Sequence, residues 1–190
     1  MTQATKADIY EEVIIAGFGG QGIILAGKLL AQTAMLSGME TTYMPSYGAE
    51  MRGGTANSMI VIAQNPVASP MVTKPTSLIV MNKASANKFV SRVKANGLVV
   101  YNSSLIDELG KIDGSVDTLA IPADDIAVEL GNLKIANMVM VGAYLARKSL
   151  LEVEQAAQAL PHVLAKRYHK TLPINIEALH KGAELANNSR

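Results

Sequence analysis

Residues 12–22 have the sequence EVIIAGFGGQG, and this stretch decides the fold. Its β-branched start, residues 12–16, predicts a buried strand, and the glycine cluster at 17–22 predicts a tight turn. Residues 23–37 are rich in Leu, Ala, Ile and Met, contain no proline and stop at Gly38. That pattern indicates a helix closed by a left-handed glycine. Strand, turn and helix form the opening of a βαβ unit.

The rest of the chain continues the alternation of strands and helices. An irregular, glycine-rich loop is expected at 45–54, and residues 149–152 (SLLE) have the spacing of a capping box. We therefore predict an α/β fold: a three-layer α/β/α domain with a mainly parallel, Rossmann-like sheet and C-terminal helices. It forms a single domain over 1–190, with 1–10 flexible and 122–187 mostly helical. Further strands are predicted at 40–44, 55–63, 78–81, 98–101 and 116–121, and further helices at 84–93, 126–130, 138–148, 152–160 and 175–187.

Charge and hydropathy exclude several classes of protein. The 190 residues carry 17 basic and 16 acidic side chains, a net charge of +1, so no overall field favours nucleic acid or an acidic membrane. No apolar run reaches the roughly 20 residues needed to span a bilayer, and the first residues do not resemble a secretory leader. We expect a cytoplasmic protein that binds neither membrane nor nucleic acid.

Cysteine is absent from the sequence. Iron–sulfur clusters are normally held by thiolates, and structural zinc sites usually include them. The three histidines, at 162, 169 and 180, have no accompanying carboxylates that suggest a metal site. We therefore expect that the chain binds no metal and no cluster of its own.

The glycine cluster matches the template G-x-G-x-x-G directly after a strand and at the start of a helix. Glycines let a ligand approach the backbone, and the free amides and helix dipole favour phosphate. Lys28 lies six residues beyond the turn and could reach such a phosphate. The alternative for Lys28 is an ordinary solvated lysine, and the alternative for the glycines is a tight turn that binds no ligand. The predicted binding residues are Gly17, Gly19, Gly20, Gln21, Gly22 and Lys28.

A dinucleotide site should also have an acidic residue at the end of the second strand, to hold the ribose hydroxyls. That strand ends at Tyr43, Met44 and Pro45. Glu40 has about the right separation but begins the strand, and so lies at the wrong edge of the sheet. An NAD(P)- or FAD-binding protein is therefore the second interpretation.

The loop after the second strand has the sequence SYGAEMRGGT. Glu50 and Arg52 are two residues apart, so in extended chain they project to the same side and could clamp a polar partner. The alternative is a surface ion pair that contributes little stability. The predicted partner interface consists of Ser46, Tyr47, Gly48, Glu50, Arg52, Gly53 and Gly54.

Five ordered segments, GFGGQG, PSYGAEMRGGTAN, PTSLIVMN, GLVVYNSSLI and NLKIANMVMVGAYLA, resemble the gamma subunit of 2-oxoacid:ferredoxin (acceptor) oxidoreductases. The resemblance covers about residues 11–185. Within that family, the segment SYGAEMRGG is similar to the 2-oxoglutarate and branched-chain 2-oxoacid types more than to the pyruvate type.

The resemblance implies an assembly that converts a 2-oxoacid, coenzyme A and oxidised ferredoxin to acyl-CoA, CO2 and reduced ferredoxin. Thiamine diphosphate, its magnesium and the iron–sulfur clusters would reside on partner subunits, alpha and beta, with a delta subunit left open. The glycine turn and Lys28 correspond to a region near the coenzyme A phosphates, and residues 46–54 would face the thiamine-bearing subunits. 2-Oxoglutarate is favoured, and an aryl pyruvate stays open.

The sequence offers no nucleophile or general-base constellation, because Ser46 lies more than a hundred residues from every histidine. We therefore predict binding and interface residues and no catalytic residue, in a chain that is inactive alone. Three interpretations stay open: an oxidoreductase subunit, an independent dinucleotide-binding enzyme, and a non-catalytic scaffold.

Overall fold

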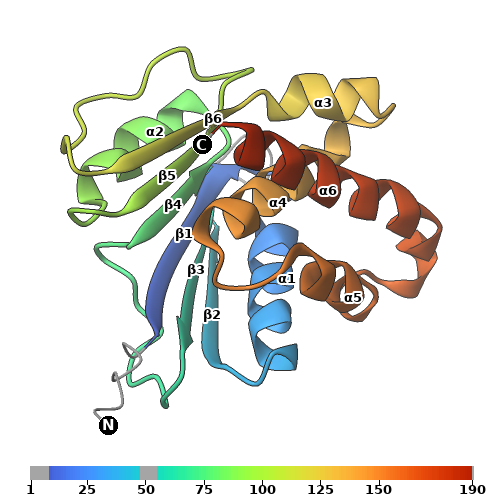
Figure 1. The fold of residues 1–190 in the computed structure, drawn as a ribbon, viewed down its shortest axis with the longest axis horizontal. Helices are drawn as coiled ribbons and strands as arrows, with labels where there is room; N and C mark the ends of the chain where they lie inside the picture. Colours follow the sequence, from blue (N-terminus) through green and yellow to red (C-terminus); the bar gives the residue numbers. More distant parts are fainter. Residues whose placement is uncertain (1–8, 48–54, 190) are drawn as a thin grey trace, which may run out of the picture.

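A computed structural model describes residues 9–47 and 55–189 of the chain. Its elements alternate as the sequence predicts (Figure 1). The strands are β1 (Tyr10–Phe18), β2 (Glu40–Tyr47), β3 (Thr55–Ala63), β4 (Ser77–Val80), β5 (Leu98–Asn102) and β6 (Asp117–Ile121). The helices are α1 (Ile23–Leu36), α2 (Lys83–Phe89), α3 (Ala123–Glu129), α4 (Ala136–Lys148), α5 (Val153–Val163) and α6 (Leu172–Asn188), with short 3-10 turns η1 (Val90–Arg92), η2 (Leu133–Ile135) and η3 (Lys166–Thr171).

The six strands form one sheet in the order β2-β3-β1-β4-β5-β6. Strands β1, β4, β5 and β6 are parallel neighbours, and β3 is antiparallel to both β1 and β2. The mainly parallel sheet is therefore confirmed. Because β3 lies between β1 and β2, the second strand is not the neighbour of the first. The direction of β2 still matches that of β1, so the carboxyl ends of both strands lie at the same end of the sheet.

Helices cover both faces of the sheet, as the three-layer prediction requires. In Figure 1, α1, α4, α5 and α6 lie on one side of the sheet and α2 on the other. The larger apolar core joins Val13 and Ile15 of β1 to α1, α3, α4, α5 and α6. The smaller core joins Ile14 and Ala16 to α2 and to residues of the segments after β3 and β5. The alternation along β1 thus divides its side chains between two cores.

Helices α4 and α6 cross in close contact because each has a glycine at the crossing. A Cβ atom on Gly142 would overlap the carbonyl oxygen of Leu179, and one on Gly182 would overlap that of Val139. Protein interiors are close-packed, so any larger side chain at either glycine would push the helices apart. This crossing fixes the start of α4, which lies next to the glycine turn.

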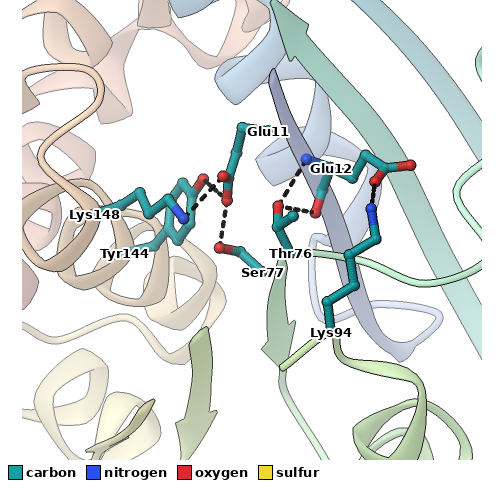
Figure 2. Close-up of polar contacts among 7 residues, drawn as sticks. All are labelled: Glu11, Glu12, Thr76, Ser77, Lys94, Tyr144 and Lys148. Carbon is teal, nitrogen blue, oxygen red and sulfur yellow. Dashed lines mark hydrogen bonds and ion pairs between the residues drawn. The ribbon is translucent and has the colours of Figure 1, made fainter. Parts of the chain in front are cut away.

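A buried polar cluster links α4 to the starts of β1 and β4, at the end of the sheet opposite the glycine turn (Figure 2). The Glu11 carboxylate is 5% exposed. It accepts hydrogen bonds from Ser77 Oγ (2.5 Å) and Tyr144 Oη (3.4 Å), and pairs with Lys148 Nζ at 2.9 Å. Burial, with the nearby Glu11 charge as the second cause, raises the pKa of Tyr144 well above its ordinary value. The tyrosine therefore stays a neutral hydrogen-bond donor.

Three details differ from the sequence predictions. Pro45, Ser46 and Tyr47 continue β2 and are not loop; a proline is tolerated there because β2 is an edge strand. The first strand begins at Tyr10, inside the stretch predicted as flexible, whose first eight residues lie outside the described part. The last helix begins at Leu172, three residues before the predicted start, with Pro173 in its first turn.

The capping box predicted at Ser149 and Glu152 is also wrong. Ser149 ends α4 in the left-handed conformation (φ 55°), and its hydroxyl donates to Ala146 O at 3.0 Å. The box begins three residues later, at Glu152, whose amide donates to Gln155 Oε1 at 2.9 Å. The spacing of a capping box fits both Ser149 with Glu152 and Glu152 with Gln155. Only the second pair forms it, because Ser149 is the left-handed residue that ends α4.

Candidate functional site

The glycine turn joins β1 to α1 at the edge where the parallel strands end. Gly20 (φ 104°) and Gly22 (φ 72°) adopt backbone conformations that side chains disfavour, and Gly22 is the N-cap of α1. Gly17 lies under the turn, where a Cβ atom would come within 2.6 Å of Ile23 Cδ1 and 2.7 Å of Gln21 Oε1. The first turn of α1 thus presents free amides at the strand ends, as a phosphate site requires.

Gln21 holds the turn in shape and uses its side chain to do so. Its Oε1 accepts hydrogen bonds from Phe18 N (2.8 Å) and from Asn82 Nδ2 (2.9 Å), while its Nε2 donates to Met81 O at 3.3 Å. The side-chain amide is therefore engaged on both sides. Gln21, predicted as a binding residue, has the contacts of a positioning residue.

Polar side chains follow the neighbouring strands at the same edge. Asn102, fully buried at the end of β5, donates to Asp124 Oδ1 at 2.7 Å, and its Oδ1 accepts from Ala123 N at 3.1 Å. Burial raises the pKa of the Asp124 carboxyl; the hydrogen bond from Asn102 opposes this shift and the Asp125 charge adds to it. Asn102 thus fixes the direction of an acidic group beside the turn.

Two hollows open on either side of the turn. The first, called here the Asp124 hollow, has a volume of about 420 Å³. Its walls come from the glycine turn, the end of β4, the start of α3 and the segment through η2. They consist of Gly20, Gln21, Met81, Asp124, Gly131, Asn132, Leu133, Lys134 and Ala136.

The second hollow, called here the Lys28 hollow, has a volume of about 730 Å³. It combines predicted binding residues with Tyr47 and with η3, whose Arg167 guanidinium lies 4.9 Å from the centre of the Tyr168 ring. Because Gly20 lines both hollows, they meet at the turn. The lining residues are Phe18, Gly19, Gly20, Gly22, Ile23, Ile24, Leu25, Lys28, Tyr47, Ala56, Arg167 and Tyr168.

The structure brings one predicted interface residue to this site. Register places Tyr47 opposite Ala56, which in turn pairs with Gly17, so the end of β2 lies level with the glycine turn. Tyr47 is 62% exposed. Ser46 is also exposed at the same strand end.

The other predicted interface residues, Gly48, Glu50, Arg52, Gly53 and Gly54, lie outside the described residues. The clamp formed by Glu50 and Arg52 stays a prediction.

A dinucleotide site needs an acidic residue near the glycine turn, and Glu40 does not supply it. Glu40 pairs with Ala63, which pairs with Tyr10, and so lies at the opposite edge from the turn, as predicted. Asp124, in the first turn of α3 after β6, lies at the same end of the sheet as the glycine turn and was not among the predicted site residues. The signal was present: Asn102 is the last residue of β5 and Asp124 comes three residues after the end of β6, and α/β proteins bind ligands where their parallel strands end.

Lys134 and Arg167 were also missed. They belong to η2 and η3, far from the glycine turn in sequence. The packing of η2 against α3, α4 and α6, and of η3 against α6, brings them to it. Sequence spacing carried no signal for either residue.

The described residues form neither a metal site nor a membrane-spanning helix. Within residues 9–47 and 55–189, no three His, Asp or Glu side chains gather as metal ligands would. His180 lies 3.6 Å from Glu154 and His169 contacts Leu164 O at 3.0 Å. Over the same residues, no helix is long and apolar enough to cross a membrane.

Known proteins similar to this chain share one family. Residues 12–185 match the family model described as pyruvate ferredoxin/flavodoxin oxidoreductase. The chain is 36% identical over 178 residues to the ketoisovalerate oxidoreductase subunit VorA of Methanothermobacter thermautotrophicus, covering 93% of this chain and 36% of that relative. It is 34% identical over 185 residues to the 2-oxoglutarate synthase subunit KorC of Methanocaldococcus jannaschii, covering 95% and 96%. The chain thus spans about a third of the VorA relative and nearly all of KorC.

Solved structures agree with the sequence relatives. The gamma subunit of the keto/oxoacid ferredoxin oxidoreductase of Geobacter sulfurreducens superposes with a TM-score of 0.79 at 26% identity, covering 94% of this chain and 99% of that one. The 2-oxoglutarate:ferredoxin oxidoreductase of Magnetococcus marinus, solved with 2-oxoglutarate, coenzyme A and succinyl-CoA, shares the fold with a TM-score of 0.84 at 24% identity, covering 94% and 31%. A family match over nearly the whole chain, joined to the fold and to the glycine turn, means that this chain belongs to the pyruvate ferredoxin/flavodoxin oxidoreductase family.

Proposed function

We propose that this chain is the gamma subunit of a 2-oxoacid:ferredoxin oxidoreductase. The assembly converts a 2-oxoacid and coenzyme A to acyl-CoA and CO2, and passes two electrons to ferredoxin. One observation supports the proposal most directly: the glycine turn, the cations Lys28 and Arg167 and the exposed Tyr47 line the same hollow. The fold around this hollow is shared with such a gamma subunit. The chain contributes to coenzyme A binding and to the surface that covers the active centre.

The phosphate-binding part of the proposal rests on charge and backbone geometry. Lys28 and Arg167 line the same hollow as Gly19, Gly20 and Gly22, so two positive side chains flank the free amides of α1. Charge-assisted contacts to phosphate are among the stronger hydrogen bonds in proteins. The net charge of only +1 makes this local concentration of positive charge more informative.

The interface part rests on exposed aromatic and apolar side chains. Tyr47 is 62% exposed, Leu133 55% and Tyr168 47%, and all three line the two hollows at the turn. Tyrosine is enriched at protein interfaces, where its ring is buried and its hydroxyl finds a partner. We expect the thiamine-bearing alpha and beta subunits to cover this rim, with a delta subunit still open.

The redox groups belong to the partner subunits in this proposal. The chain has no cysteine, so its residues do not fit an iron–sulfur cluster. Thiamine diphosphate supplies the carbanion chemistry in the assembly, and the present chain binds coenzyme A, orients it and excludes water. Loss of the chain should therefore affect acyl transfer to coenzyme A more than the reduction of clusters.

Affinity purification from the native cell, followed by mass spectrometry and cofactor analysis, tests the subunit assignment. We expect partner subunits in stoichiometric amounts, with iron and thiamine in the complex and neither in this chain alone. Iron bound by the isolated chain would contradict the assignment. Turnover of the complex with 2-oxoglutarate, 2-oxoisovalerate and an aryl pyruvate then identifies the oxoacid, for which we favour 2-oxoglutarate.

Asp124 gives a specific reason to test the second interpretation, an NAD(P)- or FAD-binding protein. Its carboxylate lies at the edge where such proteins hold ribose hydroxyls. Calorimetric titration of the chain with NAD, NADP and FAD separates the two interpretations. We expect no tight binding of any of them; low-micromolar affinity would favour the dinucleotide interpretation.

A further inference from the structure

We propose that the α2 side of the sheet binds a second copy of this chain, in a twofold-symmetric contact between two rows of opposite charge. The two rows are the basic row, Lys83, Lys88, Arg92 and Lys94, and the acidic row, Asp107, Glu108 and Asp113. The inference is independent of the proposed function, because no residue of either row lines a hollow at the glycine turn.

Charge is separated along this part of the sequence. Residues 51–106 contain six basic side chains and no acidic one, whereas residues 107–129 contain seven acidic side chains and one basic. In a chain with a net charge of +1, this separation creates local fields of opposite sign. The fold brings parts of both stretches to one face.

The basic row follows the exposed side of α2 and η1. Lys88 and Arg92 are both exposed, and each cation lies 5.2 Å from the centre of the buried Phe89 ring. They are four residues apart, where like charges on a helix repel each other. Lys94 pairs with Glu12, but no described acidic side chain pairs with Lys88 or Arg92. The charge at the centre of this row is therefore uncompensated within the described chain.

The acidic row lies beside the basic row, on the segment between β5 and β6. This segment packs into the smaller core together with α2. At one end, Lys83 Nζ contacts Glu108 O. At the other end, Asn96 N donates to Ser115 Oγ at 3.0 Å. The two rows therefore run side by side in the same direction, with their ends level.

The carboxylates of the acidic row are also unpaired. All three are exposed, and within residues 9–47 and 55–189 no cation pairs with any of them. Hydrogen bonds from the Ser115 hydroxyl and amide lower the pKa of Asp113, so this carboxyl is charged at neutral pH. The face thus presents two neighbouring rows of opposite charge that do not neutralise each other.

A twofold axis along the boundary between the rows would pair them. Rotation about this axis places each basic row over the acidic row of the other copy, and level ends stay level. Lys88 then faces Asp107 and Glu108 of the other copy, while Arg92 faces Asp113. An acidic protein of another kind would be repelled by the acidic row, so a second copy is the occupant that satisfies both rows.

We expect the dimer to be weak. Leu105, 46% exposed at the start of the acidic segment, adds an apolar contact, and no other large apolar side chain of residues 83–116 is exposed. Charge complementarity contributes more to specificity and association rate than to affinity. The dissociation constant should therefore be about 10–100 µM at low salt.

Sedimentation equilibrium of the full chain, at concentrations up to about 0.5 mM and an ionic strength of about 0.05 M, tests the contact. Lys88→Glu places like charges opposite each other, and so does the double variant Asp107→Lys with Glu108→Lys. Each should weaken self-association about tenfold, because every substitution occurs twice in a twofold contact. An equimolar mixture of the two variants should form a heterodimer at least as tight as the wild-type dimer, since opposite charges then face each other again.

Two further variants separate the rows from general effects of charge. Lys181→Glu makes the same change on α6, on the other side of the sheet, and should leave self-association unchanged. Lys111 is the one cation of the acidic segment and faces the basic row of the other copy. Lys111→Glu should therefore tighten the dimer, by about threefold. Raising the ionic strength to about 0.5 M should dissociate the wild type. Circular dichroism checks that each variant is folded.

The other outcomes contradict the inference. A wild-type chain that stays monomeric over the whole concentration range has no such contact. A dimer that Lys88→Glu and the double variant leave unchanged uses another face. If the two folded variants do not associate when mixed, the rows do not face each other. Loss of binding to a different protein, with self-association unchanged, would assign the face to that protein. None of these results changes the proposed function, which rests on the hollows at the glycine turn.

Discussion

Gln21 and Asn82, 61 residues apart in sequence, are joined by a hydrogen bond of 2.9 Å from Asn82 Nδ2 to Gln21 Oε1. Asn82 also caps α2, accepting from Ser85 N at 2.9 Å. One side chain thus connects the glycine turn after β1 to the helix on the other face of the sheet. The shape of the turn therefore depends on β4 as well as on its own glycines.

Replacement of Gln21 by alanine should destabilise the fold. Phe18 N and Asn82 Nδ2 would both lose their acceptor, and a buried donor left without a partner costs about 1–3 kcal/mol. Gln21→Glu keeps an acceptor for both donors, and its second oxygen can donate to Met81 O only when the carboxyl is protonated, so it should cost less than alanine at acid pH. Chemical denaturation of the two variants measures the difference. Equal losses would mean that volume, and not hydrogen bonding, explains the residue.

Tyr47→Ala should leave the free energy of unfolding of the isolated chain nearly unchanged, because the side chain is 62% exposed. Assembly should weaken, since buried tyrosines at interfaces often contribute 2 kcal/mol or more, about thirtyfold in affinity. Tyr10→Ala is the matched control: Tyr10 is 52% exposed and lies at the opposite edge of the sheet. Co-purification with partner subunits distinguishes the two, and equal effects would argue against an interface at the turn.

Arg52→Ala tests the predicted clamp in the segment outside the described residues. A surface ion pair contributes about 0–1 kcal/mol, so the isolated chain should unfold at nearly the wild-type temperature. Loss of one partner from a charge pair that is buried in a complex costs roughly 2–5 kcal/mol, so assembly or ferredoxin reduction should decrease. A less stable chain with normal assembly and turnover would assign the segment to internal scaffolding.

Asp124→Asn should raise the stability of the free chain at neutral pH. Burial raises the pKa of Asp124 in the folded state, so ionisation opposes folding. The stability of the wild type should therefore fall as pH rises from the ordinary carboxyl pKa of about 3.9 through the higher folded value. The asparagine variant keeps an acceptor for Asn102 and lacks this fall. Unfolding followed from pH 4 upward would contradict the prediction if both proteins changed in parallel.

Lys148→Met should destabilise the chain strongly. The Glu11 carboxylate would keep its hydroxyl donors, Ser77 and Tyr144, but lose its counter-charge while 5% exposed. Removal of one partner from a fully buried ion pair costs about 3–5 kcal/mol, and this is an upper limit here because the Lys148 side chain is 30% exposed. The double variant Glu11→Gln with Lys148→Met removes both charges and should recover part of the loss. Thermal and chemical unfolding of the single and double variants measure it.

How far the sequence leads depends on the kind of signal. Short β-branched runs such as β3 were predicted with their bounds, because apolar side chains on both faces leave few alternatives. Pro45 misled the prediction of β2, since only the order of strands reveals that β2 is an edge. Ser149 and Glu152 misled the cap, since spacing does not report a left-handed turn.

The residues of the candidate site likewise differ in whether the sequence carries a local signal for them. The glycine turn was evident because its chemistry is local. Asp124 had a detectable signal at a strand end, although it was not used. Lys134 and Arg167 had none, because the distance from η2 and η3 to α1 is set by the packing of α4, α5 and α6.

The buried Glu11 cluster has a consequence for the order of events during synthesis. Glu11 stands in β1, the first of these six strands to leave the ribosome, yet its partner Tyr144 follows 133 residues later. At about 5–20 residues per second, the carboxylate waits roughly 7–27 seconds for the hydroxyl and ammonium that satisfy it. The central strand of the sheet therefore cannot reach its final environment until most of the chain has emerged, and a ribosome that stalls before α4 leaves an apolar strand uncovered for chaperones to hold.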